Sequence, residues 1–248
     1  ESYERLKPYL YDKYRAQVAV EDAKQYKKMH DDGDLVMWIT VDGFFYFPRT
    51  LFGIEEHLFA FYDKPELMHR MNQDQADFIN YIIDEVSETI QPDFMTFAED
   101  MSYNLGPMLS EEMFDEFLLP YYRQTVPRVE EAGIIPIVDT DGQLEGMIPW
   151  LQRAGIRGAL PLERKAGVDV NRIRKNYPDF LIIGAYDKMV MSVSEQAMRE
   201  EFERLLPAMR SGGYIPSVDH QTPPEVSLDN YRIYLKLLEE YCIKGAAR

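Results

Sequence analysis

The sequence predicts an α/β fold in which a parallel sheet is covered by helices. Three observations lead to this fold class. Short apolar segments of five to seven residues alternate with longer amphipathic segments along the 248-residue chain, which is typical of parallel strands joined by crossover helices. Hydrophobic residues make up 46% of the chain, so it can bury a sizeable core. The first apolar segment is not followed by a glycine-rich phosphate-binding loop, which argues against a nucleotide-binding Rossmann domain.

Six apolar segments are expected to form strands. A closed parallel barrel needs eight strands, whereas an open doubly wound sheet does not. The six segments are LVMWIT (35–40), DFMTFA (93–98), IIPIV (134–138), IRGALPL (156–162), FLIIGAY (180–186) and YIPSV (214–218).

The remaining periodic segments carry apolar residues at helical spacing. Ser110, followed by Glu111 and Glu112, suits a helix start, and Pro120 and Pro149 are expected to kink or split their helices. The aromatic segment 41–53 is expected to be a loop. Helices are expected at 2–30, 54–62, 65–90, 110–133, 144–155, 169–178, 192–213 and 227–245.

The charge balance excludes two classes of partner. The chain has 43 acidic and 27 basic residues and a formal net charge of -16, so we expect neither nucleic acid nor an anionic membrane to bind. No apolar stretch approaches the roughly 20 residues of a membrane span, and the amino terminus lacks signal-peptide features. The single cysteine, Cys242, cannot form a disulfide within the chain, which favours a reducing, cytoplasmic location.

Acidic residues follow five successive predicted strands. Because the carboxyl ends of parallel strands meet at one edge of a sheet, we expect these side chains to converge. One such residue alone is explained by helix capping or a turn. A run of five instead favours a metal site or a shared proton. The residues after the five strands are Glu99 and Asp100, Asp139 and Asp141, Glu163, Asp187 and Lys188, and Asp219 and His220.

His220 is the one histidine of four that follows a predicted strand. It is a candidate metal ligand or acid–base group; the alternative is a surface turn before Pro223 and Pro224. The strands before Asp139 and His220 are three steps apart, about 14 Å at ~4.8 Å per strand. Side chains that point into a barrel mouth can meet across that distance.

The aromatic segment FFYFPR (44–49) has two interpretations. Its rings, Phe45 among them, either belong to the core or form the wall of an apolar pocket. In the second case Arg49 is placed to bind an anionic group of a substrate.

Several segments together resemble the uroporphyrinogen decarboxylase superfamily, and the resemblance covers essentially the whole chain. It implies a (β/α)8 TIM-type barrel with its site at the carboxyl-terminal mouth, lacking the first two strands here, and a single domain over 1–248. The superfamily contains uroporphyrinogen decarboxylases and methyltransferases that move methyl groups between corrinoid cofactors, thiols and methoxylated compounds. The segments are GGYIPSVDHQTPPEVSLDNYRIYL, DKPELMHRMNQ, NLGPMLSEEMFDEFLLPYYRQTV and LIIGAYDK.

The resemblance also implies a metal. The decarboxylases' active-site tyrosine falls on Thr50 here. The zinc-binding His-x-Cys pair and later Cys of the thiol-methylating branch fall on Asp139, Asp141 and His220. These oxygen and nitrogen donors can still bind zinc, with Glu163 as a further ligand. FAEDMSYNLGP resembles the ether-demethylating members.

The resulting hypothesis is a metal-dependent methyltransferase that moves a methyl group from a methoxylated or similar small substrate to a corrinoid (cobalamin) on a partner protein. A homodimer is also expected. One alternative is a decarboxylase-like lyase acting on an anionic, tetrapyrrole-type substrate, with His220 and a carboxyl as acid–base pair; another is a non-catalytic degenerate barrel. The candidate catalytic residues are Glu99, Asp100 and Asp187, and the candidate substrate-binding residues are Phe45, Arg49, Tyr103 and Asn104.

Overall fold

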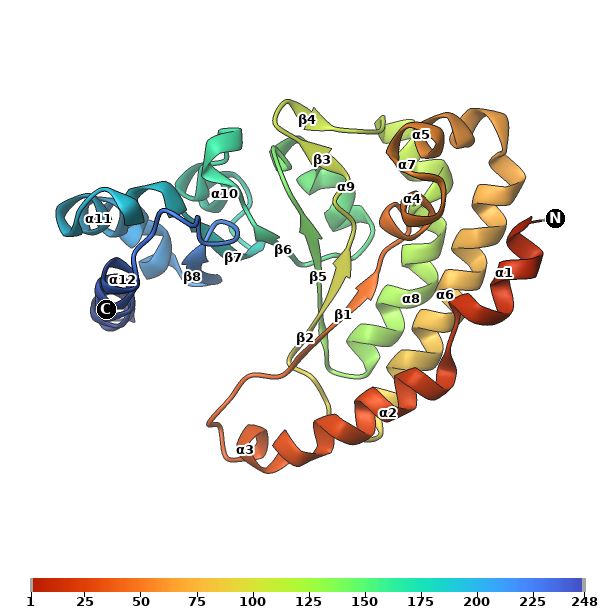
Figure 1. Ribbon diagram of the computed structural model, residues 1–248, viewed down its shortest axis with the longest axis horizontal. Helices are drawn as coiled ribbons and strands as arrows, with labels where there is room; N and C mark the ends of the chain where they lie inside the picture. The colour runs from red at the N-terminus through yellow and green to blue at the C-terminus, as the bar shows by residue number, and fades with distance from the viewer. Residues whose placement is uncertain (1, 247–248) are drawn as a thin grey trace. The chain divides into compact units, whose positions relative to one another are not determined.

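The computed structural model describes residues 2–246 (Figure 1). Its internal contacts divide the chain into two compact units. The first contains Glu1–Glu99, Leu109–Ile137 and Trp150–Ile156, and the second contains Asp100–Met108, Val138–Pro149 and Arg157–Arg248. That the chain forms one domain stays a prediction.

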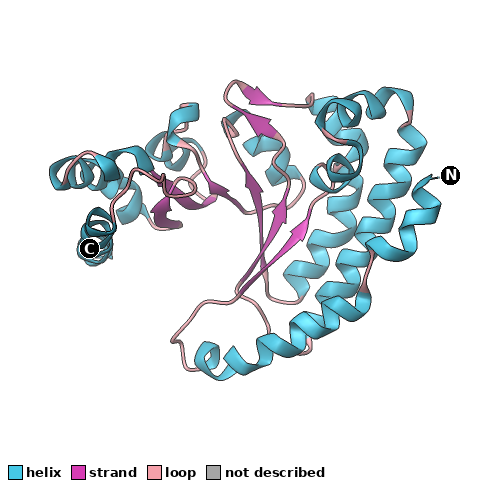
Figure 2. Cartoon of the chain, in the orientation of Figure 1, coloured by secondary structure: helices cyan, strands magenta, loops and turns pink. Residues whose placement is uncertain are grey.

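Strands alternate with helices along the chain, as the sequence predicts (Figure 2). The six main strands have the order β1-β2-β5-β6-β7-β8, and the pairs β1–β2, β6–β7 and β7–β8 are parallel. This confirms an α/β fold with six strand–helix units. The strands are β1 (Trp38–Asp42), β2 (Phe94–Ala98), β5 (Ile135–Thr140), β6 (Gly158–Pro161), β7 (Leu181–Tyr186) and β8 (Tyr214–Val218).

A small antiparallel pair was not predicted from the sequence. Strand β3 (Ser102–Tyr103) pairs with β4 (Gly106–Pro107) in the second unit. Two-residue strands are too short to show an alternating pattern.

The helices of the first unit differ from the expectation at two places. The expected helix 2–30 is broken because the Asp12 carboxylate accepts the Arg15 N–H (3.0 Å) and begins a new helix. The expected aromatic loop contains a helix, α4 (Tyr46–Phe52). The others are α1 (Ser2–Leu10), α2 (Lys13–Ala23), η1 (Lys24–Tyr26), α3 (Lys27–Asp31), α5 (Ile54–Asp63), α6 (Pro65–Ser87), α7 (Glu111–Phe117) and α8 (Leu119–Glu131).

Both helix-interrupting prolines act as the sequence predicts. Pro120 stands in the first turn of α8, after the break that separates it from α7 at Leu118. Pro149 lies in α9 (Ile148–Arg153), which follows the short η2 (Glu145–Met147), so the expected helix 144–155 is divided.

Helices α11 and α12 pack against each other in the second unit (Figure 1). Tyr186 of β7, Phe202 of α11 and Tyr234 of α12 form an aromatic core there, with ring centroids 4.5–5.9 Å apart. The helices of this unit are η3 (Arg164–Ala166), α10 (Val170–Asn176), η4 (Lys188–Ser192), α11 (Glu195–Ser211) and α12 (Leu228–Ala246), besides η2.

In the first unit, α6 and α8 pack together (Figure 1). A cavity of about 570 Å³ is lined by residues of α1, α2, β1 and α6, and none of the predicted site residues lines it. Within residues 2–246, no helix combines the length and apolarity needed to cross a membrane.

Candidate metal centre

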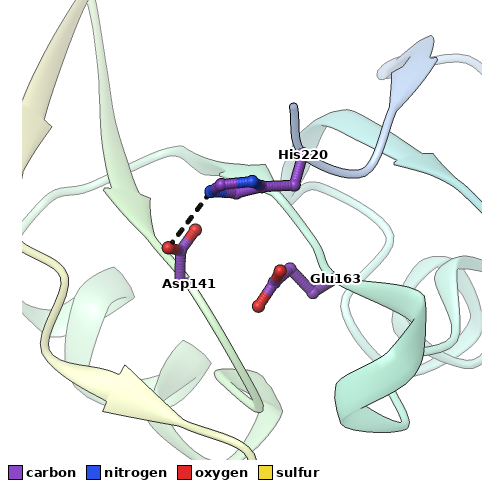
Figure 3. A group of neighbouring side chains, drawn as sticks. All are labelled: Asp141, Glu163 and His220. Carbon is purple, nitrogen blue, oxygen red and sulfur yellow. Dashed lines mark ion pairs between the residues drawn. The ribbon is translucent and has the colours of Figure 1, made fainter. Parts of the chain in front are cut away.

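Three loops of the second unit bring Asp141, Glu163 and His220 together (Figure 3). Asp141 directly follows β5, Glu163 is two positions after β6, and His220 is two positions after β8. Each residue offers one ligand atom, and these atoms lie within 4.8 Å of one another. In the described part of the chain this is the one group of three or more His, Cys, Asp or Glu residues with that geometry.

His220 and Asp141 form the closest pair in this group. The His220 Nε2 atom lies 3.3 Å from an Asp141 carboxylate oxygen, and each side chain is about one-third exposed, 34% and 38%. Burial raises the pKa of Asp141, while His220 lowers it and the charge of Glu163 raises it. Because both side chains are partly exposed, a small ligand can reach the pair.

Glu163 is held by two groups from other loops. Its Oε2 atom accepts the Gly142 N–H at 3.1 Å, and its Oε1 atom lies 3.4 Å from the Lys188 Nζ. Gly142 has a φ of +78°, and a Cβ there would lie 2.5 Å from the backbone of Tyr103. Only glycine fits this position. Its backbone N–H orients the Glu163 carboxylate.

Asp219, which is buried next to His220, joins three loops. Its carboxylate accepts the Arg164 N–H (2.8 Å) after Glu163 and the Lys188 N–H (3.2 Å) after β7. Its Oδ1 atom also lies 3.7 Å from the Lys188 Nζ. Burial raises the pKa of Asp219, and the two backbone bonds and Lys188 lower it. The strand-end position of Asp219 was visible in the sequence, but its role between loops was not.

The structure does not bring Asp139 into the three-residue group, although it was an expected ligand. Strand β5 continues to Thr140, so Asp139 lies within the strand, about 6.6 Å before Asp141 along it. Burial, Asp141 and Asp100 raise the pKa of Asp139 to about 6, and His220 lowers it. The Asp100 N–H donates to the Asp139 carbonyl at 3.2 Å. Asp100 and Asp139 thus border the group.

Glu99 lies in the first unit and has no exposed surface. Its carboxylate accepts the N–H groups of Phe44 (2.8 Å), Phe45 (2.7 Å) and Tyr46 (3.2 Å) and the Tyr122 hydroxyl. Burial raises its pKa to about 7, against the lowering effect of these bonds. Glu99 was predicted to be a catalytic residue. This prediction is corrected, because its carboxylate is buried and binds the N–H groups at the start of α4.

Phe45 is also a core residue, which corrects its prediction as a pocket wall. Its ring is fully buried, 4.6 Å from that of His57 and 6.2 Å from that of Phe61. Arg49 belongs to α4, and its guanidinium lies 5.7 Å from the ring centroid of Tyr46. The sequence could not separate these roles, because aromatic cores and aromatic pockets have the same composition.

The other candidate residues lie in the second unit. Tyr103 and Asn104 are exposed at the β3–β4 hairpin, where the Tyr103 carbonyl accepts the Gln143 N–H at 2.8 Å. Asp187 caps η4 by accepting the Met189 N–H at 2.9 Å. Asp187 therefore has the capping role that a strand-end aspartate often has.

The donor set of the three-residue group suits a divalent first-row metal. One imidazole nitrogen and two carboxylates are ordinary ligands of zinc and its neighbours. Three protein ligands also leave a coordination position for a substrate or water, as in catalytic zinc sites. The residues present thus fit the metal that the resemblance implies.

The fold and the position of the site define an α/β protein whose polar residues gather at the carboxyl ends of its strands. Comparison with known proteins identifies the family. Residues 49–241 match the family described as uroporphyrinogen decarboxylase (URO-D). The chain belongs to this family.

The fold is also similar to that of a methyltransferase from Methanosarcina mazei. The TM-score is 0.66 and the sequence identity 14%, over 90% of this chain and 64% of that protein. The chain thus spans less than two thirds of that protein's length, and at this identity the similarity shows the fold. No curated protein matches the sequence.

Proposed function

We propose that the protein is a metal-dependent methyltransferase of the uroporphyrinogen decarboxylase family. It would take the methyl group of a methoxylated or similar small substrate and pass it to a corrinoid on a partner protein. The observation that carries the proposal is the convergence of ligand atoms from Asp141, Glu163 and His220 within 4.8 Å. The similarity to the fold of a methyltransferase supports it.

Asp141, Glu163 and His220 would hold the metal. When bound, a metal such as zinc supplies a Lewis acid that polarises a substrate oxygen. Gly142 and Lys188 orient the Glu163 carboxylate, and Asp219 holds the loops that carry Glu163 and His220. Asp100 and Asp139 border the group and would hold or move a proton at the leaving oxygen.

The first test is the metal content of the purified protein by elemental mass spectrometry. We expect near one zinc, or another first-row metal, per chain, and loss of that metal in Asp141→Ala and His220→Ala. His30→Ala is the matched control, because His30 also pairs with a carboxylate, that of Asp93 at 3.0 Å, in the first unit. A protein without metal after incubation with zinc, or folded variants that keep it, would contradict the proposed site.

The second test is the reaction. Metal-loaded protein is mixed with a methoxylated aromatic compound and cob(I)alamin, and methylcobalamin formation is followed by absorbance. We expect turnover that disappears in His220→Ala. If the protein binds metal but transfers no methyl group from any of a panel of methyl ethers, the proposed metal site is supported. The proposal that methoxylated compounds are the methyl donors is then contradicted.

A lyase is the second candidate, and one observation favours it. The carboxylates of Asp139 and Asp141 interact with His220, so the same loops also offer an acid–base pair. Release of carbon dioxide from a tetrapyrrole carboxylate by metal-free protein would support this function over methyl transfer.

A further inference from the structure

We propose that Lys188 is a built-in counter-ion of Glu163 that sets the metal affinity of the site. Its ammonium group pairs with a carboxylate oxygen that a metal would use, so a metal must compete with it. This inference rests on the proposed metal site and adds a residue that neither the sequence motif nor the ligand geometry assigns to it.

Lys188 is unusually well held for a lysine. Its side chain is 13% exposed, and its Nζ lies 3.4 Å from Glu163 Oε1 and 3.7 Å from Asp219 Oδ1. Its backbone N–H also donates to Asp219. Asp219 is itself 1% exposed and accepts the Arg164 N–H. Because Asp219 is held in this way, it holds the Lys188 ammonium group next to Glu163.

Both carboxylates of the site already have partners. Asp141 faces the His220 ring, and Glu163 uses Oε2 for the Gly142 N–H and Oε1 for Lys188. A metal bound to Glu163 therefore either displaces Lys188 from Oε1 or shares the carboxylate with it. In both cases a positive charge remains near the cation, which lowers its affinity.

Loss of Lys188 should not release Glu163. The Gly142 N–H still orients the carboxylate, and Gly142 is confined by the Tyr103 backbone. The repulsion would thus disappear while the ligand stays in place. We expect the metal to bind more tightly without the lysine, by about tenfold or more.

The test is calorimetric titration of ZnCl₂ into EDTA-treated protein. Lys188→Met is expected to lower the zinc Kd by about tenfold or more relative to the native protein, an estimate for one charge at this separation. Lys188→Arg keeps the charge and should stay within about twofold. The matched control is Lys165→Met, which removes the same charge from an exposed position two residues after Glu163. Circular dichroism verifies folding, and Lys188→Gln replaces Lys188→Met if the latter does not fold.

The outcomes separate this inference from the proposed function. If zinc binds the native protein and its Kd in Lys188→Met is equal or higher, Lys188 is not the counter-ion. The proposed metal site is then unaffected. Absence of binding in both proteins overturns both. Zinc binding to both proteins, with a Kd at least about tenfold lower in Lys188→Met than in the native protein, supports the counter-ion role, as does the same order with Lys188→Gln.

Discussion

The His220 Nε2 atom lies 3.3 Å from an Asp141 carboxylate oxygen, although β6 and β7 separate the two residues in the sequence. Asp141 follows β5 and His220 follows β8, so both side chains emerge at the carboxyl ends of their strands. The pair is stabilised when the imidazole is charged or when a metal is shared between its atoms.

Gly142→Ala is expected to disturb the loop that carries Asp141. The backbone has a φ of +78°, and a Cβ would lie 2.5 Å from the Tyr103 backbone. The strain should lower the free energy of unfolding by about 1–3 kcal/mol and weaken zinc binding, because the N–H that orients Glu163 moves. Chemical denaturation and calorimetric titration measure the two effects. The control is Gly146→Ala, where a Cβ has no neighbour within 4 Å; equal effects of both substitutions would contradict the prediction.

Asp219→Asn should destabilise the second unit. The asparagine amide replaces one acceptor oxygen with a donor, so one of the N–H groups of Arg164 and Lys188 loses its partner. Because Asp219 is buried, the cost should be about 2 kcal/mol in the free energy of unfolding. Urea denaturation monitors this, with Asp229→Asn as control, because Asp229 is 87% exposed. A loss no larger than that of the control would show that Asp219 does not stabilise these loops.

Glu99 should make stability fall as the pH rises through the weakly acidic range. Burial raises its pKa to about 7 from 4.5, so the native state keeps a proton that the unfolded state has lost. The contribution of Glu99 to stability is therefore fully present below pH 4.5 and is lost as the pH rises to 7, by about 3 kcal/mol.

Glu99→Gln tests this pH dependence. Urea denaturation between pH 4.5 and 8 should give a stability profile for the variant that lacks the decline. Exposed Glu131 provides the control Glu131→Gln, which should follow the native profile. If the profiles of Glu99→Gln and the native protein run parallel, Glu99 does not titrate in this range.

His57→Phe should stabilise the first unit. Among the described residues, neither ring nitrogen of the buried His57 has a hydrogen-bond partner. Phenylalanine removes this unsatisfied polarity between Phe45 and Phe61, which is worth about 1 kcal/mol.

The gain should be larger in acid. Burial, with a smaller effect from Arg49, lowers the pKa of His57 to about 4 from 6.5, so native stability falls as the pH drops from 6.5 towards 4. Thermal melts at pH 8 and pH 5 measure the difference. In the control His69→Phe, the bond to the Tyr121 hydroxyl (2.9 Å) is lost and stability should decrease. A destabilised His57→Phe would contradict the prediction.

The sequence by itself was sufficient for the fold class and for most strands. The segment 214–218 is a strand with the predicted bounds, and 93–98 and 180–186 each differ by one residue at the start. Compact apolar runs bounded by turn residues determine such elements locally. The strand-end positions of Asp141, Glu163 and His220 were likewise visible, because parallel strands place their carboxyl ends together.

Only the tertiary structure decided which of the acidic residues act together. Glu99 and Asp141 both follow strands, yet Glu99 caps α4 in the first unit while Asp141 faces His220 in the second. The Glu99 carboxylate accepts the N–H groups at the start of α4, although it is distant from them in the sequence. The pairing of Lys188 with Glu163 and Asp219 likewise joins three loops. Local sequence determines where a strand ends, but burial and long-range hydrogen bonds determine what each side chain meets there.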